Sequence, residues 1–193
     1  FNSILKSLSI PNIKILLTGK GRVGSGTKEV LDFLKIKQVS AHDFINETYN
    51  ESVYVNIDVL DYNYSDSIEN TVSSFYNYPE KFRSTFSKFL SVSDIYFAGH
   101  YHNPKAPKLI TLDDIKNPDF NIQVIADISC DIDGPIASTI RPSTIENPTY
   151  GFHKEKLVEC DFLDKNALAV MAVDNLPCEL PRDSSEMFGE MFL

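Results

Sequence analysis

The sequence predicts an α/β fold with a doubly wound, mostly parallel sheet. Short apolar runs of strand length recur along the chain, and segments whose apolar residues follow helical spacing lie between them. Strands that alternate with helices imply βαβ crossovers. Several of the runs have no polar alternation, which is typical of parallel strands that are covered on both faces.

The first predicted unit is a strand, a turn and a helix. The strand is the apolar run IKILL at 13–17, and the helix follows a group of glycines, because Val23, Val30, Leu31 and Leu34 have helical spacing. Further strands are expected at 37–41, 52–57, 94–99, 121–129 and 167–173.

A second helix is expected at 78–90, where Phe82, Phe86 and either Phe89 or Leu90 form an apolar stripe that would pack against the sheet. The preceding segment, 61–78, is polar with scattered aromatic residues, and we expect it to be an irregular connection.

Composition limits the class of protein. A chain of 193 residues with 42% hydrophobic content is enough for one domain with a packed core. The net charge of -9 and the lack of a Lys/Arg cluster argue against a nucleic-acid partner. We find neither an apolar run of about 18 residues nor a secretion signal, so we expect a cytoplasmic protein without a membrane span. The odd number of cysteines, three, fits reduced thiols.

Half of the eight glycines lie between residues 19 and 26, directly after the first strand. Gly19, Gly21 and Gly24 form the pattern G-x-G-x-x-G, which in a strand-turn-helix context predicts a Rossmann dinucleotide-binding loop. The first glycine permits the turn, the second admits the pyrophosphate, and the third lets helix and strand pack closely. Arg22 and Val23 complete the predicted contacts; the alternative is a flexible loop.

A Rossmann fold also needs an acid at the end of the next strand to bind the adenosine ribose. Asp43 lies nineteen residues beyond Gly24 and is the predicted ribose ligand; the alternative is that it caps the following turn. Residues 39–80 contain no Lys or Arg, which favours NAD over NADP. Lys20 and Arg22 could still reach a 2′-phosphate.

Three further segments, 99–110, 126–152 and 170–188, resemble the family of alanine dehydrogenases, the soluble domain of nicotinamide nucleotide transhydrogenase and the lysine-forming saccharopine dehydrogenases. With the glycine loop they cover nearly the whole chain. The pieces DNLP and LPRD are most similar to the saccharopine dehydrogenase branch. The pieces DIDGP and VDNLP differ from the alanine dehydrogenase patterns, which weakens alanine as the substrate.

The resemblance implies a two-domain enzyme in which this chain, 1–193, is the single NAD-binding domain, and we expect it to be excised from a longer polypeptide. Residues 1–10 and 184–193 would be helical connections to a catalytic domain that carries the main acid-base lysine and histidine and the substrate-binding arginine. The amino-acid or keto-acid substrate would be shared with that domain, and the isolated domain would be inactive. Whether the chain forms a homo-oligomer is left open.

The resemblance also implies roles for individual residues. Asp131 and Asp174 match functional acids of the family, Asn175 matches a residue at the nicotinamide end of the cofactor, and Gly99 opens a loop beside the nicotinamide ribose. From the residues themselves, Asp127, Asp131 and Asp133 form an acidic cluster at the carboxyl end of a strand, and alternation along a strand would put Asp127, Ser129 and Asp131 on one side; the alternative is a solvated acidic loop.

The remaining candidates carry weaker signals. His100 and His102 form an H-x-H pair, but no third ligand is evident, so no metal is expected. Cys130 has no histidine beside it that could act as a base. Arg141 could bind substrate or close a loop ion pair.

The leading hypothesis is therefore an NAD-dependent oxidoreductase that acts on CH–NH groups by hydride transfer, of the saccharopine dehydrogenase type first and the alanine dehydrogenase type second. The alternatives are a non-catalytic NAD(H)-binding regulatory module, a transhydrogenase component, and a degenerate domain that binds no nucleotide.

Overall fold

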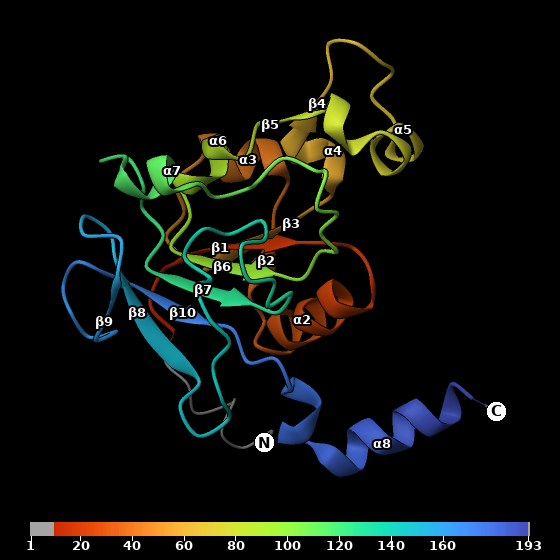
Figure 1. Ribbon diagram of the computed structural model, residues 1–193, viewed down its shortest axis with the longest axis vertical. Helices are drawn as coiled ribbons and strands as arrows, with labels where there is room; N and C mark the ends of the chain where they lie inside the picture. The colour runs from red at the N-terminus through yellow and green to blue at the C-terminus, as the bar shows by residue number, and fades with distance from the viewer. Residues whose placement is uncertain (1–9, 193) are drawn as a thin grey trace.

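A computed structural model describes residues 10–192 of the chain. Its centre is an eight-stranded sheet in the order β2-β3-β1-β6-β7-β10-β8-β9 (Figure 1). The strands are β1 Lys14–Thr18, β2 Lys37–Gln38, β3 Val53–Ile57, β6 Ile95–Ala98, β7 Val124–Asp127, β8 Thr149–His153, β9 Glu159–Cys160 and β10 Ala167–Met171. All pairs from β2 to β10 are parallel, and β8 and β9 add antiparallel pairs at one edge. The predicted α/β class with a mostly parallel sheet is confirmed.

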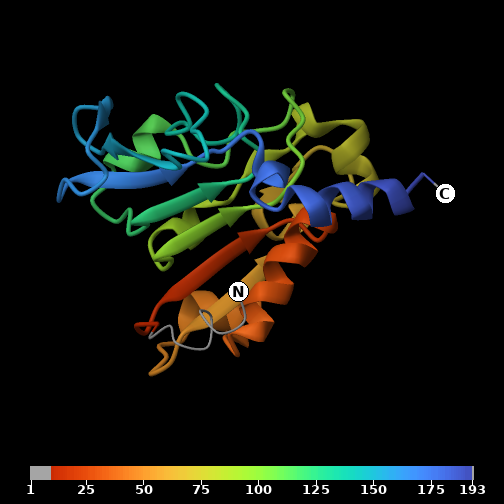
Figure 2. The ribbon, with the colours of Figure 1, turned by 90° about the horizontal axis from the view of Figure 1, so that it is seen from below.

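Helices cover both faces of this sheet (Figures 1 and 2). Helix α2, Arg22–Phe33, covers one face, where Leu31 and Ile36 join Ile15, Leu17 and Tyr54 in a small core. The other face carries α3 Ala41–Asn46, α4 Val59–Tyr62, α5 Val72–Asn77, α6 Ser87–Leu90 and α7 Leu112–Lys116.

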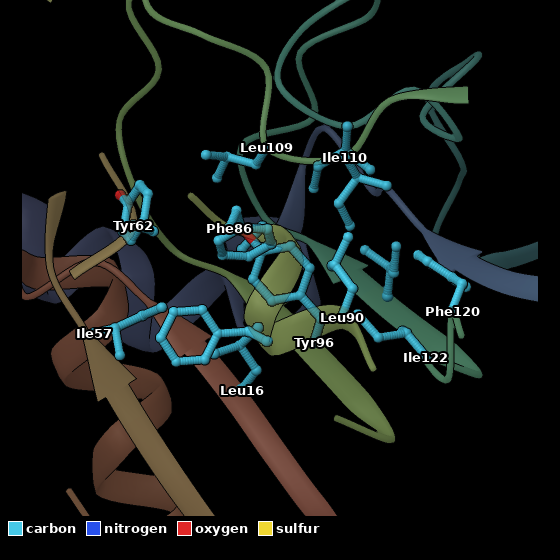
Figure 3. Close-up of a cluster of buried hydrophobic side chains, with 14 of the residues drawn as sticks. Leu16, Ile57, Tyr62, Phe86, Leu90, Tyr96, Leu109, Ile110, Phe120 and Ile122 are labelled. Atoms are coloured by element: carbon cyan, nitrogen blue, oxygen red, sulfur yellow. The ribbon is translucent and has the colours of Figure 1, made fainter. Parts of the chain in front are cut away.

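The larger core lies between the sheet and these short helices (Figure 3). Phe86 is fully buried, with its ring centroid 5.3 Å from that of Tyr96 and 5.5 Å from that of Tyr62. Leu16 and Ile122 are also fully buried. Because β1 and its parallel neighbours are covered on both sides, their apolar runs need no polar alternation.

The expected helix at 78–90 is wrong. The segment folds as a 3₁₀ turn η1 Pro79–Lys81, a short strand β5 Arg83–Ser84 and the one-turn helix α6. Phe82, Phe86 and Phe89 are buried as predicted, but Phe82 has an extended backbone, whereas Phe86 caps α6 and Phe89 lies within it. The spacing of the apolar residues correctly indicated which side chains face the core. It did not predict the backbone conformation, which here depends on tertiary packing.

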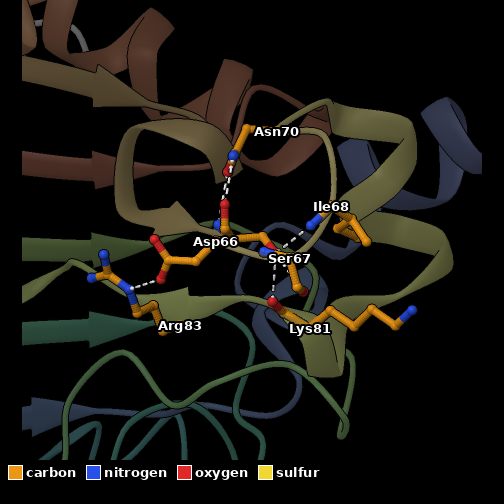
Figure 4. Close-up of polar contacts among 7 residues, drawn as sticks. Asp66, Ser67, Ile68, Asn70, Lys81 and Arg83 are labelled. Atoms are coloured by element: carbon orange, nitrogen blue, oxygen red, sulfur yellow. Dashed lines mark hydrogen bonds and ion pairs between the residues drawn. The ribbon is translucent and has the colours of Figure 1, made fainter.

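The polar segment 61–78 is more regular than expected, since it contains β4 Asn63–Tyr64, which pairs with β5, and helix α5. A tight polar turn lies between them (Figure 4). The backbone N–H of Ser65 donates to Oδ1 of Asn70 at 2.8 Å, and Ser65 Oγ donates to the carbonyl of Lys81 at 2.8 Å. Arg83 pairs with Asp66 at 3.1 Å.

The chain ends in the 3₁₀ turn η2 Leu176–Glu179 and the helix α8 Pro181–Glu190, which extends away from the sheet (Figures 1 and 2). A helix was expected at 184–193, and α8 covers most of that range; its role as a connection stays a prediction. Of the helical connection predicted at 1–10, residues 1–9 lie outside the described residues. None of the helices between residues 10 and 192 has the length and apolar character that a membrane crossing requires.

Candidate functional site

A cavity of about 540 Å³ lies at the carboxyl ends of β1, β6 and β7. Open α/β sheets bind their ligands at this edge. The structure brings five of the predicted site residues to the cavity wall: Gly21, Arg22, Val23, Gly99 and Asp131. His100, Tyr101, His102 and Ser129 also line it.

Gly19 and Gly24 shape the turn above this cavity. Gly19 has φ +93°, and a Cβ there would overlap the carbonyl of Gly99, while a Cβ at Gly24 would overlap the carbonyl oxygen of Gly19. A Cβ at Gly21, in contrast, would meet no atom within 4 Å. The predicted division of labour among the three glycines therefore fits the geometry: two permit close packing, and Gly21 leaves its backbone open to a ligand.

Helix α2 begins at Arg22 with Gly21 as N-cap, and no side chain caps it. The N–H groups of a first helical turn have no partner within the helix, and the dipole there favours negative charge. The start of α2 faces the same cavity through Gly21, Arg22 and Val23. A phosphate group fits this arrangement.

One residue of the cavity wall, His100, belongs to a chain of three hydrogen-bonded side chains. Thr18 Oγ1 lies 3.0 Å from the Tyr96 hydroxyl and 2.8 Å from His100 Nδ1. Burial lowers the pKa of His100 to about 4. Burial also lowers the pKa of His102, and the negative charge of nearby Asp131 partly offsets this by raising it. His100 is thus mainly neutral at pH 7, and its Nδ1 takes part in the hydrogen bond with Thr18 as part of a neutral imidazole.

Asp127 is fully buried at the end of β7 and organises the loop that follows. Its Oδ1 accepts hydrogen bonds from Ser129 Oγ at 2.6 Å and from the backbone N–H groups of Ser129 and Cys130, while its Oδ2 accepts from Thr139 Oγ1 at 2.6 Å. The strand ends at Asp127, so the expectation that Asp127 and Asp131 share one side of a continuing strand is wrong. Asp131 lies instead in the loop, exposed at the cavity wall.

Two neighbours of Asp131 have no direct part in the cavity lining. Asp133 is exposed and has φ +56°. Cys130 donates its thiol to the carbonyl of Val173 at 3.2 Å, and burial, reinforced by nearby carboxylates, raises the pKa of the thiol to about 11. A thiol held in the protonated form is a poor nucleophile, as expected from the lack of a neighbouring base.

Asp174 and Asn175 follow β10, at the same edge of the sheet as the cavity, and both are exposed. Neither lines the cavity. Asn175 precedes η2, and the contact between Cys130 and Val173 joins this segment to the loop that holds Asp131. Arg141 forms its ion pair with Glu159, at 2.7 Å, which is the second of its two predicted roles.

Asp43 is not placed where the ribose acid was expected. The strand that follows α2 is β2 at the sheet edge, and β3 lies between it and β1. Asp43 is exposed in the first turn of α3, where its N–H donates to Ser40 Oγ at 3.1 Å. The alternative reading, a residue in a capped turn, describes its position.

The acid beside the glycine loop is Asp58, which the sequence analysis missed. β1 pairs with β3, so that Thr18 lies opposite Ile57, and the N–H of Gly19 donates to the carbonyl of Ile57 at 3.0 Å. Asp58 follows directly and caps α4 through Oδ1, which accepts from the N–H of Val59 at 2.8 Å. The signal in the sequence was the segment VYVNI at 53–57, which is more apolar than 37–41 and is followed directly by an acid.

Within residues 10–192, no three side chains of His, Cys, Asp or Glu converge in a way that could hold a metal ion. His100 and His102 share the cavity wall without a third ligand.

No family model matches the chain. The mitochondrial alpha-aminoadipic semialdehyde synthase of Bos taurus is 25% identical over 207 residues, which cover 95% of this chain and 22% of that protein. The Arabidopsis thaliana alpha-aminoadipic semialdehyde synthase is 28% identical over 123 residues, 62% of this chain and 12% of the relative. The saccharopine dehydrogenase (NAD(+), L-lysine-forming) of Schizosaccharomyces pombe is 30% identical over 104 residues, 54% of this chain and 27% of the relative.

The chain thus spans about a fifth of the length of the mammalian relatives it matches. These similarities support the saccharopine dehydrogenase branch of the predicted resemblance and an amino-acid oxidoreductase-like domain. They give no support to the alanine dehydrogenase and transhydrogenase branches.

Proposed function

We propose that this chain is the NAD-binding domain of an amino-acid oxidoreductase of the saccharopine dehydrogenase type, which acts on a CH–NH group. The observation that carries the proposal is the open backbone of Gly21 at the uncapped start of α2, facing the cavity at the carboxyl edge of the sheet. When bound, the nicotinamide cofactor supplies the hydride acceptor or donor. The protein supplies binding, orientation and local charge.

The residues that would hold the adenosine and pyrophosphate part of the cofactor lie at the start of α2 and at the end of β3. The amides at Gly21, Arg22 and Val23 would hold the pyrophosphate, and Asp58, beside Gly19, would accept hydrogen bonds from the adenosine ribose hydroxyls. A carboxylate at that point repels a 2′-phosphate, so the proposed cofactor is NAD. The names of the fungal relatives specify NAD(+).

The nicotinamide end would lie over the Gly99 loop and the loop of Asp131. Asp131 is the one carboxylate among the described cavity-lining residues, so it would orient or balance a substrate ammonium group. Asp174 and Asn175, which lie at the same edge outside the lining, would complete the site when substrate and the rest of a longer polypeptide close over it. A cytoplasmic location remains part of the proposal.

Calorimetric titration of the protein with NADH and, separately, with NADPH tests this function. NADH should bind, and more tightly than NADPH. Gly21→Val should leave the protein folded, since a Cβ at this position would meet no atom within 4 Å. The substitution should nevertheless abolish binding, because the valine side chain would occupy the space that the pyrophosphate needs. Gly26→Ala, which also meets no atom within 4 Å, is the control and should bind like wild type.

Failure of both nucleotides to bind at millimolar concentration, or wild-type affinity of Gly21→Val, would overturn the proposal. An assay of a longer polypeptide that contains this domain, with a panel of amino acids and NAD, separates an oxidoreductase from a regulatory module that binds NAD(H) without turnover.

A further inference from the structure

A second polar cavity, of about 350 Å³, lies at the opposite edge of the sheet. It is lined by Gln123, just before β7 begins, and by Asn166, just before β10 begins, whereas the dinucleotide cavity lies where β7 ends. Three lysines line it: Lys116 from the last turn of α7, Lys154 from the segment after β8, and Lys165 from the segment before β10. The comparisons and the proposed function leave this cavity without a role.

Lys154 is held in place on the cavity wall. Its Nζ donates to the carbonyl of Ile122 at 3.0 Å and lies 5.3 Å from the centroid of the Phe120 ring. The side chain is half-buried; burial lowers its pKa, and no neighbouring carboxylate acts against that shift. An ammonium group has three N–H donors, and the carbonyl of Ile122 uses one. The remaining donors can therefore bind a group that enters the cavity, and an anion would balance the charge of the half-buried ammonium group.

The charge around this cavity contrasts with that of the whole chain. The protein has 27 acidic and 18 basic residues, yet three of the four charged side chains described at this cavity are lysines. Between residues 10 and 192, none of the three is within ion-pair distance of a carboxylate. Glu155, the acidic member of the lining, is exposed.

A structural role accounts fully for Lys116 and in part for Lys154, whose Nζ contacts the carbonyl of Ile122 and the ring of Phe120. Lys116 lies in the last turn of α7, where a cation stabilises the helix dipole. Lys154 and Lys165 lie in connections outside any helix, so the dipole of a helix does not explain their convergence. The amide side chains of Asn117, Gln123 and Asn166 add neutral donors to the same cavity.

We propose that this cavity binds a small anion through a phosphate or carboxylate group, at a site separate from the dinucleotide cavity. Lys154 would be the fixed contact, since it is already positioned by Ile122 and Phe120, and Lys165 and Lys116 would close on the anion from the rim. The ligand class is a phosphorylated or polycarboxylic metabolite small enough for about 350 Å³. The occupant would be in contact with the start of β7, whose other end carries the loop of Asp131.

The test follows backbone amide signals by NMR while inorganic phosphate or citrate is added at constant ionic strength. Saturable shifts are expected at Gln123, Lys154 and Asn166, and they should persist with saturating NADH, which displaces phosphate from the glycine loop. Saturation by only one of the two probes identifies the preferred group. An absence of NADH-dependent shifts at the glycine loop would count against the proposed function alone, since the lysine cavity is read from other signals.

Two double variants test whether the lysines of the cavity bind the anion. Lys154→Met with Lys165→Met should weaken anion binding at least about tenfold, because charge-assisted hydrogen bonds are lost. Lys81→Met with Lys88→Met removes two exposed lysines elsewhere and should leave binding unchanged. If the first pair lowers the unfolding temperature, Lys165→Gln alone, on an exposed side chain, should still weaken binding about threefold. Shifts confined to the glycine loop, shifts that do not saturate, or equal losses in both double variants would overturn the proposal.

Discussion

The backbone N–H of Gly19 donates to the carbonyl of Ile57 at 3.0 Å, which fixes the end of β3 against the glycine turn. Asp58, the next residue, is thereby the carboxylate at the end of the strand that neighbours β1. Chain order suggested Asp43 for this position, and the order of strands in the sheet favours Asp58.

Asp58→Ser separates the two roles of Asp58, since serine keeps the N-cap of α4 but removes the charge. We expect the affinity for NADH to fall about tenfold, because charge-assisted hydrogen bonds to the ribose are lost. The ratio of NADH affinity to NADPH affinity should therefore decrease. Calorimetric titration with both nucleotides measures this. Asp43→Ala is the matched control on an exposed acid; if it alone changed the preference, Asp43 would regain the assignment.

Gly24→Ala should destabilise the fold by about 1–3 kcal/mol, because its Cβ would overlap the carbonyl oxygen of Gly19 and both atoms belong to constrained backbone. Gly26→Ala, in the same helix but with open space around it, should be neutral or stabilise by up to about 1 kcal/mol. Urea unfolding of the two variants gives the comparison. Equal stability of both would mean that the close approach of α2 to the glycine turn is wrong.

Asp127→Asn should cost about 1.5–3 kcal/mol of unfolding free energy, since a buried carboxylate that accepts bonds from Ser129, Cys130 and Thr139 becomes a neutral amide. Asp131→Asn, on an exposed side chain, should change stability by less than about 0.5 kcal/mol. In a longer, active polypeptide Asp131→Asn should instead reduce turnover more than cofactor affinity. Wild-type kinetics of that variant would remove Asp131 from the mechanism.

His100 should make stability depend on pH between about 4 and 6.5. Burial lowers its pKa from 6.5 to about 4 in the folded protein, so in this range the unfolded chain binds more protons. The stabilisation is therefore complete above pH 6.5 and decreases as the pH falls towards 4, with a slope of at most about 1.4 kcal/mol per pH unit.

Urea unfolding across this range should show a shallower slope for His100→Gln than for wild type. His42→Gln, on an exposed side chain, is the control and should follow wild type. Parallel pH profiles for wild type and His100→Gln would show that His100 is not desolvated in the folded protein.

Local patterns in the sequence predicted the central strands, α2 and the glycine turn. The strands are covered on both faces and have clear apolar runs, and the glycines mark the turn from which α2 begins. The helix at 78–90 failed for a physical reason. Phe82, Phe86 and Phe89 all fill the core, but the pairing of Arg83 and Ser84 with Asn63 and Tyr64 straightens the chain between them. A periodicity in one segment carries no information about a partner strand about twenty residues away.

The site was predictable to the extent that it depends on backbone chemistry. Glycine spacing and resemblance predicted Gly21, Arg22, Val23, Gly99 and Asp131, and these five residues line one cavity; their binding and catalytic roles stay predictions. Asp58 and the buried network of Asp127 were not found, since each depends on which strands are neighbours and where a strand stops. The edge pair β8 and β9 also went unpredicted: β8 is a buried five-residue strand whose sequence, TYGFH, contains few apolar residues, and β9 has only two residues.

Both outermost strands of the sheet, β2 and β9, are only two residues long, and they carry exposed Lys37 and Glu159. A long edge strand with unpaired backbone N–H and C=O groups can pair with a strand of another chain, which can lead to amyloid-like aggregation. Here each edge strand has too few unpaired backbone groups to form a stable β-ladder with another chain. Each edge strand also carries an exposed charged side chain. Between residues 10 and 192 the edges of the sheet are therefore poor templates for strand addition, which favours association through side-chain surfaces.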